Sequence, residues 1–452
     1  MKKDLTFTQN GECKTAKWKH IEQLYAIDNC EETRLGPKLA DGHIFEKKMN
    51  KMKVSTMAQV FSHTVGSLIK RLSKWDTKTA YNVDAEGVHT GDFILFIDEL
   101  FDSLNSNNAH APSNKPLKSG FRRNSPHEEF WRNAIKVLET VRWYNLEKGI
   151  NVKIPSIINL IKTLKGFIEI KRRLTARVSY VLSREINQDC LENFFASLRG
   201  HGRFNKSPDV AHFVSSFKAL LVNNFFSRHS PRANCEEDFS TGVLGTLRCF
   251  LTGEEIAGIS SLENEDLAIP SAEGNTQLHQ QKSRVAKATI AYVAGYVAKK
   301  ILQNYGQCEE CVKMLTHSDG DVPMAVIEAR QYRLSTLTKP GSYLYFVTSE
   351  CVSRLLFYIP RICYKQFISV LLRELINSEL DFNVLNCNIH PTLGNSVVEF
   401  QIRVMLFYWA KQINLILKGN RNEFLKNKTL RATDPIKVHA HNMYLKRKKQ
   451  NI

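Results

Sequence analysis

The sequence predicts a mainly α-helical fold that opens with a β-hairpin. In residues 4–18, a turn-forming Asn-Gly pair separates two short stretches of alternating polarity, which is typical of two antiparallel strands. After this segment, apolar residues recur three and four positions apart, which is the spacing of one face of a helix. The chain of 452 residues is also too long for one ordinary core, so we expect two or three domains.

The helical pattern divides the chain into two blocks. In the first block we expect helices at 51–72, 91–105, 126–149, 154–174, 187–200 and 208–226. A polar stretch after the second of these helices predicts an exposed loop. Residues 227–285 are acidic and rich in turn formers, so they mark a domain boundary. The second block is helical throughout, with apolar periodicity at 284–303, 348–375 and 397–417.

Positive charge is spread along the whole chain. The formal net charge of +18 favours a polyanionic partner, nucleic acid first, because positive potential attracts phosphates and binding releases counterions. The alternative is a basic protein that its charge keeps in solution. The basic block at 446–449 is a nuclear import signal, a phosphate contact or a solvated chain end.

Cysteine usage and hydropathy bear on the compartment. Ten cysteines are scattered along a chain that shows no secretory leader, so we expect a reducing compartment and free thiols. No apolar run approaches the length of about 18 residues that a membrane span needs, so we expect no membrane partner.

The segment NQDCLENFF at 187–195 places two acidic residues beside an apolar face. Asp189 and Glu192 project from one side of the expected helix. The apolar face comprises Leu191, Phe194, Phe195 and Leu198. One interpretation is that the acids complement the helix dipole. The other is a carboxylate held against aromatic side chains, where it ligates a divalent metal or bonds to a nucleotide.

Several runs resemble P-element-type transposases, the relatives of the THAP-domain transposases. The run from INQDCLENFF to FKALL resembles the segment in which that family's chain re-enters an RNase H-like catalytic fold after a large insertion. MKVSTMAQVFSHTVGSLI and FILFIDELFDSLN resemble its GTP-binding insertion domain. NCEED, YVAGYVAKKI and FQIRVMLFYWAKQIN resemble its helical C-terminal region.

The resemblance implies a domain order and site residues. The implied domains are a residual RNase H-like hairpin at 1–20, a helical GTP-binding insertion domain at 21–186, a short RNase H-like C-terminal segment at 187–228 and a helical C-terminal domain at 229–452. Glu192 matches the glutamate of the family's Asp-Asp-Glu triad, which binds Mg²⁺ for phosphodiester chemistry. The positions that match the guanine nucleotide pocket are Asp102, Asn105 and Asp189, with Lys53 and Ser62 as phosphate and ribose contacts.

One departure from the family limits the implied activity. The chain opens at about the last hairpin before the family's insertion, and Asp4, Asp28 and Asp41 do not follow the apolar strand runs that would position a metal-binding aspartate. One carboxylate cannot hold two cations, so we expect an incomplete catalytic site. The implied nucleotide pocket is not a Walker site, because the sequence contains no G-x-x-x-x-G-K-[ST] motif.

Two cysteine-containing pairs have the spacing of a zinc site. Cys308 and Cys311 form one pair, and Cys387 and His390 form the other, each with a gap of two residues. The pairs lie far apart in the chain, so they must meet through the fold to bind zinc. The alternative is a set of reduced thiols near helix ends.

Basic residues flank the segment 187–195 on both sides and are candidates for a DNA channel. The DNA-binding candidates are Lys171, Arg172, Arg173, Arg177, Arg199 and Arg203. The alternative is a solvated helix face.

The sequence therefore predicts a P-element-type transposase derivative in the nucleus. The resemblance implies that it binds a guanine nucleotide, and resemblance and charge together favour DNA as a partner. A homo-oligomeric state is left open, and we do not expect the chain to catalyse transposition alone. The alternative is a non-catalytic interaction or regulatory module, such as a repressor that pairs with full-length transposase.

Overall fold

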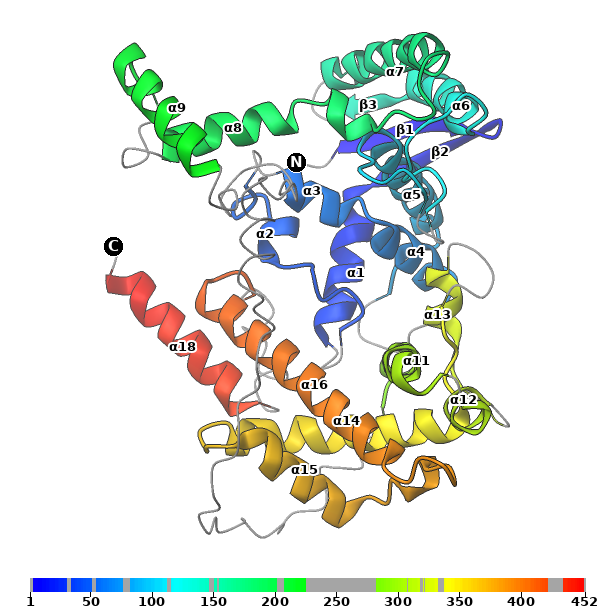
Figure 1. The fold of residues 1–452 in the computed structure, drawn as a ribbon, viewed down its shortest axis with the longest axis vertical. Helices are drawn as coiled ribbons and strands as arrows, with labels where there is room; N and C mark the ends of the chain where they lie inside the picture. The colour runs from blue at the N-terminus through cyan, green and yellow to red at the C-terminus, as the bar shows by residue number, and fades with distance from the viewer. Residues whose placement is uncertain are drawn as a thin grey trace.

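The computed structural model has three packed parts and a projecting arm (Figure 1). The sheet and its helices lie at one end, a group of short helices lies in the middle, and the C-terminal helices lie at the other end. The residues that it describes are 3–30, 34–50, 54–75, 82–111, 115–145, 150–152, 154–200, 207–224, 282–306, 308–317, 320, 322–331, 337–421 and 434–450.

The predicted N-terminal hairpin is confirmed. Strands β1 (Lys3–Gln9) and β2 (Glu12–Lys17) pair antiparallel around a two-residue turn. Asn10 and Gly11 have φ angles of 53° and 80°, the left-handed conformation that this type of turn needs and that Asn and Gly tolerate. The turn chemistry therefore sets the register of the hairpin.

Two further strands extend this hairpin into an antiparallel sheet of order β2-β1-β3-β4. Strand β3 (Arg142–Asn145) lies where the sequence predicted the last part of a helix at 126–149, and β4 (Ile150–Val152) begins just after that range. That prediction was wrong beyond Thr140, where α6 (His127–Thr140) ends. The free edge of β1 pairs with β3, and this long-range pairing overrides the local helical pattern.

Five helices in the first half of the chain surround one apolar core. They are α1 (Trp18–Cys30), α2 (Asp41–Ile44), α3 (Val54–Val60), α4 (His63–Leu72) and α5 (Gly87–Leu104). The single helix predicted at 51–72 is wrong, because Ser62 adopts an extended conformation and caps a new helix there. Helices α4 and α5 cross closely at Gly66 and Gly91, where an added Cβ at Gly91 would lie 2.8 Å from the carbonyl oxygen of Gly66. A larger side chain would force the two helices apart.

Helices α8 and α9 form the projecting arm (Figure 1). The chain reaches it through α7 (Pro155–Leu174) and η1 (Ser183–Ile186), and the arm itself comprises α8 (Asp189–Gly200) and α9 (Val210–Asn224). The expected apolar packing face of α8 is not buried, because Leu191 and Phe195 are 55% and 39% exposed. Only Leu198 of that face is fully buried. Much of the apolar face of α8 is therefore exposed in the described part of the chain.

The C-terminal part is all-helical, as predicted. Its elements are α11 (Arg284–Tyr305), α12 (Glu309–Thr316), α13 (Ala325–Arg330), α14 (Ser342–Ile362), α15 (Ile368–Glu379), η3 (Asn383–Leu385), α16 (Leu393–Leu417) and α18 (Pro435–Gln450). The run at 348–375 is two helices, because the chain turns at Phe367, whose φ is 51°. The predicted boundary at 227–285 lies almost wholly outside the described residues.

Three apolar cores hold these parts together. The first lies between the sheet and helices α5 to α7, the second among α1, α4 and α5, and the third among α11, α12, α14, α15 and α16. The second core also takes Val285 and Ala288 from α11, so the C-terminal part packs directly on the middle helices. A cavity of about 440 Å³ lies at this junction, and Ser62, Tyr292 and Arg330 are among its lining residues.

In the portion of the chain that the structure describes, none of the helices is both long enough and apolar enough to cross a membrane.

Candidate functional site

The C-terminal end of helix α5 holds a buried acidic cluster. Asp98 and Asp102 lie one turn apart and are only 8% and 7% exposed. The Nζ of Lys115 lies 3.2 Å from Asp98 Oδ2 and also contacts Asp102. The Nζ of Lys118 lies 3.8 Å from Asp102 Oδ1. The two lysines compensate carboxylate charge that burial alone would disfavour.

Burial also controls protonation around this cluster. It raises the pKa of the Asp98 carboxyl, and the nearby Lys115 ammonium opposes that shift. The backbone of His63 donates a hydrogen bond to Asp98, so the start of α4 lies against the acidic end of α5. Burial lowers the pKa of the His63 imidazole to about 4, and the positive charges of Lys115 and Arg330 contribute. His63 is therefore neutral at physiological pH.

The side chain of Ser62 has a structural role. As N-cap of α4, its Oγ lies 3.5 Å from the backbone nitrogen of Val65 and donates to the carbonyl oxygen of Gln59 at 2.9 Å. Because Ser62 precedes His63, it stands beside the acidic cluster and also lines the cavity described above. Lys53, the other expected phosphate or ribose contact, lies outside the described residues.

Asn105 joins α5 to the beginning of α8. Its Oδ1 accepts a hydrogen bond of 3.1 Å from the Nδ2 of Asn187. One residue later, the backbone nitrogen of Ser106 donates to the Oγ of Ser183 at 2.8 Å. These contacts hold the segment that precedes α8 against the end of α5, and Asn187 lies two residues before Asp189, the first residue of α8. The structure thus places Ser62, Asp102 and Asn105 in one region, where the start of α4 and the segment before α8 meet the end of α5.

Glu192, the expected triad glutamate, is exposed on α8. Among the described residues, it belongs to no group of three or more acidic, histidine or cysteine side chains that could hold a metal ion. The expectation that the triad lacks its two aspartates stays a prediction.

The expected basic surface divides into buried and exposed members. Lys171 is 5% exposed, and its Nζ pairs with Glu128 at 3.1 Å. This corrects the expectation that Lys171 faces DNA, because its ammonium is already held inside the protein. Arg172 and Arg173 are exposed and both pair with Glu169. The two remaining described candidates, Arg177 and Arg199, are exposed, and Arg203 lies outside the described residues.

The two cysteine-containing pairs meet in the fold. Cys311 Sγ lies 3.4 Å from Cys387 Sγ and 3.3 Å from the Nδ1 of His390. Cys387 Sγ lies 3.9 Å from Cys308 Sγ and 3.5 Å from His390 Nδ1. All four ligand atoms lie within 4.8 Å of one another. The four residues form a group that could hold a metal ion.

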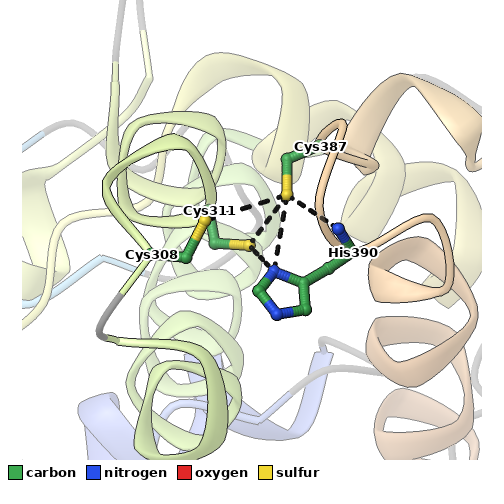
Figure 2. Close-up of side chains that lie close together, drawn as sticks. All are labelled: Cys308, Cys311, Cys387 and His390. Carbon is green, nitrogen blue, oxygen red and sulfur yellow. Dashed lines mark hydrogen bonds between the residues drawn. The ribbon is translucent and has the colours of Figure 1, made fainter.

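Secondary structure explains how these four side chains converge (Figure 2). Cys308 is the N-cap of α12, and Cys311 lies in its first turn. Cys387 and His390 lie in the short connection between η3 and α16. Figure 2 shows the cysteine side chains and the imidazole directed toward one another from these two segments.

Sequence analysis missed Asp98, Lys115 and His63 at the acidic cluster. Asp98 had a usable signal, because residues four apart on a helix share a face and Asp98 precedes Asp102 by four. Lys115 lies in the predicted polar loop, which gives no local indication of its partner. His63 was missed because the predicted continuous helix hid the start of α4.

Two segments of the chain match known protein families. Residues 2–117 match the family described as TNP-like, GTP-binding insertion domain. Residues 185–218 match the family described as TNP-like, RNase H C-terminal domain. The first match begins inside the segment expected to precede the insertion, so the boundary at residue 20 stays a prediction.

One relative and one solved structure extend the comparison. The Transposable element P transposase of Drosophila melanogaster is 24% identical over 314 residues, which is 66% of this chain and 38% of the relative. The chain therefore spans well under half of that relative's length. The Drosophila P element transposase strand transfer complex is 21% identical, with a TM-score of 0.37 over 48% of this chain and 47% of that chain. These sequence matches show that the chain is similar to P-element-type transposases in its GTP-binding insertion and RNase H C-terminal segments.

Proposed function

We propose that this protein is a P-element-type transposase derivative that binds a guanine nucleotide and DNA and does not catalyse strand transfer alone. The observation that carries the proposal is the buried acidic and amide cluster at the end of α5, formed by Asp98, Asp102 and Asn105. This cluster lies within residues 2–117, the segment that matches a GTP-binding insertion domain.

The cluster has the chemistry that guanine requires. A carboxylate can accept from the N1 and N2 donors of the base, and an asparagine amide can both donate and accept. In our proposal Asp102 exchanges its Lys115 contact for the base, which leaves Lys115 and Lys118 near the phosphates. The segment before α8 lies beside Asn105, and Ser62 lies next to the cluster. Asp189 and Lys53 are proposed contacts on the resemblance alone.

Calorimetry with GTP and Mg²⁺ tests the pocket, using Asp102→Ala and a matched control. The control is Asp92→Ala, because Asp92 lies on the same helix and also sits between two lysines, with its carboxylate 2.7 Å from Lys14 Nζ and 2.6 Å from Lys70 Nζ. We expect Asp102→Ala to weaken GTP binding by about tenfold to a hundredfold, since it removes charge-assisted hydrogen bonds. Asp92→Ala should leave GTP affinity unchanged.

Inosine triphosphate sharpens this test because its base lacks the 2-amino group. The intact protein should bind it more weakly than GTP, and Asp102→Ala should abolish that difference. Equal heats for both aspartate variants, or an unchanged preference for GTP in Asp102→Ala, would count against the assigned pocket.

We propose that the exposed arginines at the end of α7 and on α8 contact DNA phosphates. Arg173, Arg177 and Arg199 flank the segment that carries Glu192, and each guanidinium is on the surface. Phosphate contacts release counterions, so their loss reduces the salt dependence of binding by about one unit of slope per contact. The proposed location in the cell, the nucleus, follows from this DNA partner.

The DNA surface is tested by measuring affinity for duplex DNA at several salt concentrations. Arg173→Glu should weaken binding and flatten its salt dependence. Arg132→Glu is the matched control, because both arginines are exposed and pair with a glutamate one helical turn earlier. If the two variants lose affinity equally, the effect comes from net charge and the assigned surface is wrong.

The proposed lack of catalysis rests on Glu192. We infer that Glu192 serves as one carboxylate of an Mg²⁺-binding triad and that one carboxylate is insufficient for strand transfer. The intact chain with Mg²⁺ should therefore join no transposon end to target DNA. Joining by the purified chain that disappears in Glu192→Gln would refute this part of the proposal.

The second candidate function is a regulatory module that pairs with a longer transposase or with a copy of itself. The observation that favours it is the exposed apolar surface on the arm, where Leu191, Phe195 and Val210 are 55%, 39% and 80% exposed. Mixing the protein with a full-length P-element-type transposase should then lower strand transfer, and Leu191→Ser should relieve the inhibition. Inhibition that competes only for DNA would argue against it.

A further inference from the structure

The centre formed by Cys308, Cys311, Cys387 and His390 has no part in the proposed nucleotide or DNA chemistry. It lies in the C-terminal part, in the connections around α12 and α16, and draws its ligand atoms from two segments that are distant in sequence. A buried cysteine can pack alone as a small apolar residue. Packing alone therefore does not explain why three thiols and one imidazole converge, whereas a shared metal ion would.

The spacing of these atoms fits one tetrahedral metal ion. For a tetrahedral Zn²⁺ with its usual bond lengths, ligand sulfur atoms lie about 3.8 Å apart, and sulfur and nitrogen lie about 3.5 Å apart. The observed S···S distances are 3.4 and 3.9 Å, and the S···N distances are 3.3 and 3.5 Å. The other two distances are within 4.8 Å, so the four atoms lie close enough together to surround one metal ion.

We propose that these four residues bind one Zn²⁺ in a structural site. Three thiolates and one imidazole form a Cys₃His set, a recognised ligand combination of structural zinc. Thiolate ligands exclude Mg²⁺ and Ca²⁺, which prefer oxygen. All four positions come from the protein, so no position remains open for water or a substrate, and the site is not catalytic.

Contacts around the centre hold the ligands in place. The backbone nitrogen of His390 lies 3.1 Å from Cys387 Sγ and donates to it, which favours a thiolate at that position. The Oε2 of Glu310 accepts from the backbone nitrogen of Asn388 at 3.3 Å, so α12 also holds the connection that carries the second ligand pair. The ring of Tyr305 packs edge-on against His390 at 5.1 Å and limits its rotation.

The metal would fasten α12 to the N-terminus of α16. Cys311 and Cys387 both belong to the third apolar core, so the site closes one end of that core. Because binding requires the folded arrangement, the free energy of zinc binding adds to the stability of the C-terminal part.

The alternative to a metal is a disulfide between two of the three cysteines. The sulfur atoms of Cys311 and Cys387 lie 3.4 Å apart, well beyond the bond length of about 2.05 Å, so no disulfide is present in this arrangement. A disulfide would also leave the third thiol and the imidazole without a shared partner.

The test is elemental analysis of the full-length protein, purified without chelator, with Cys308→Ser as the diagnostic variant. Serine is a preferred N-cap, so this substitution removes a ligand while keeping the start of α12 intact. Cys351→Ala is the matched control, because Cys351 is a fully buried cysteine of the same core with no role in the centre. We expect about one zinc per chain in the intact protein and in Cys351→Ala, and at least a fivefold lower content in Cys308→Ser.

Cobalt substitution and heat stability provide independent readouts. Co²⁺ in the intact protein should give the thiolate charge-transfer and visible bands of a tetrahedral site, and these should weaken in Cys308→Ser. A chelator should lower the unfolding temperature of the intact protein but not that of Cys308→Ser. Absence of stoichiometric zinc, full zinc retention by Cys308→Ser, or a disulfide mapped between two of Cys308, Cys311 and Cys387 would each overturn the proposal.

Discussion

The hydrogen bond between Trp131 and Ser103 supports the end of α5 that carries the proposed nucleotide contacts. Trp131 is fully buried, and its ring makes edge-on contacts with Phe121 and Phe167 at 5.5 and 5.6 Å. Its Nε1 donates to the Oγ of Ser103 at 3.0 Å. Ser103 is also fully buried and is the residue after Asp102, so its side chain anchors the helix end to the first core.

The substitution Ser103→Ala should destabilise the protein by about 1–2 kcal/mol. It removes one oxygen and leaves the indole N–H of Trp131 buried without a partner, which costs about 1–3 kcal/mol. Alanine recovers about 0.5 kcal/mol through its higher helix propensity, so the loss of the hydrogen bond decides the sign. In a Trp131→Phe background the N–H is absent, and Ser103→Ala should then cost little.

Urea unfolding followed by far-ultraviolet circular dichroism measures these free energies in a double-mutant cycle. The matched control is Ser378→Ala, because the hydroxyl of Ser378 donates to a carbonyl three residues earlier, as that of Ser103 does, but it is exposed. We expect Ser378→Ala to be neutral or slightly stabilising. An equal cost of Ser103→Ala with Trp131 or Phe at position 131 would refute the reasoning, since the coupling would then be absent.

Two further predictions concern pH and close packing. Burial lowers the pKa of His63 from 6.5 to about 4, so protonation favours the unfolded state and stability falls as pH drops from 6.5 to 4. His63→Gln should reduce that fall by about 1–2 kcal/mol, after allowing for solvent screening of a partly exposed ring, and unfolding at pH 7.5 and pH 4.5 measures it. An identical pH dependence in the variant would exclude His63 as its source. Gly91→Ala should destabilise by about 1–3 kcal/mol, because its Cβ would lie 2.8 Å from the Gly66 carbonyl oxygen of the facing helix. Gly166→Ala, whose Cβ meets nothing within 4 Å, should instead stabilise by up to about 1 kcal/mol, and thermal unfolding of both variants checks the opposite signs.

Local sequence patterns predicted the parts of the fold that depend on a few neighbouring residues. Asn10 and Gly11 specify the turn of the hairpin, because few residues tolerate the left-handed conformation that both adopt there. The apolar spacing of residues 91–105 likewise predicted α5, since a continuous stripe buries one face of a helix. Such signals act within a window of several residues, so the sequence contains them directly.

Breaks between helices escaped prediction because they depend on weaker local signals and on tertiary partners. The apolar pattern at 51–72 continues across Ser62, yet the helix is interrupted there. Ser62 caps α4, and the backbone of His63 contacts the acidic end of α5. Strand β3 forms because β1 offers it an edge more than one hundred residues away in sequence. No pattern within the segment 142–145 specifies that edge.

The sequence by itself determined the ligand types of the proposed zinc site and several residue types of the proposed nucleotide pocket. Their meeting was decided only by the tertiary structure. Cys308 and Cys311 reach Cys387 and His390 because α12 and the start of α16 pack on one core. The spacing within each pair does not indicate that packing. Lys171 illustrates the converse, since its buried contact with Glu128 removes it from the surface to which its basic neighbours belong. Residue type sets the chemistry that is available, whereas burial and long-range contacts select the groups that can use it.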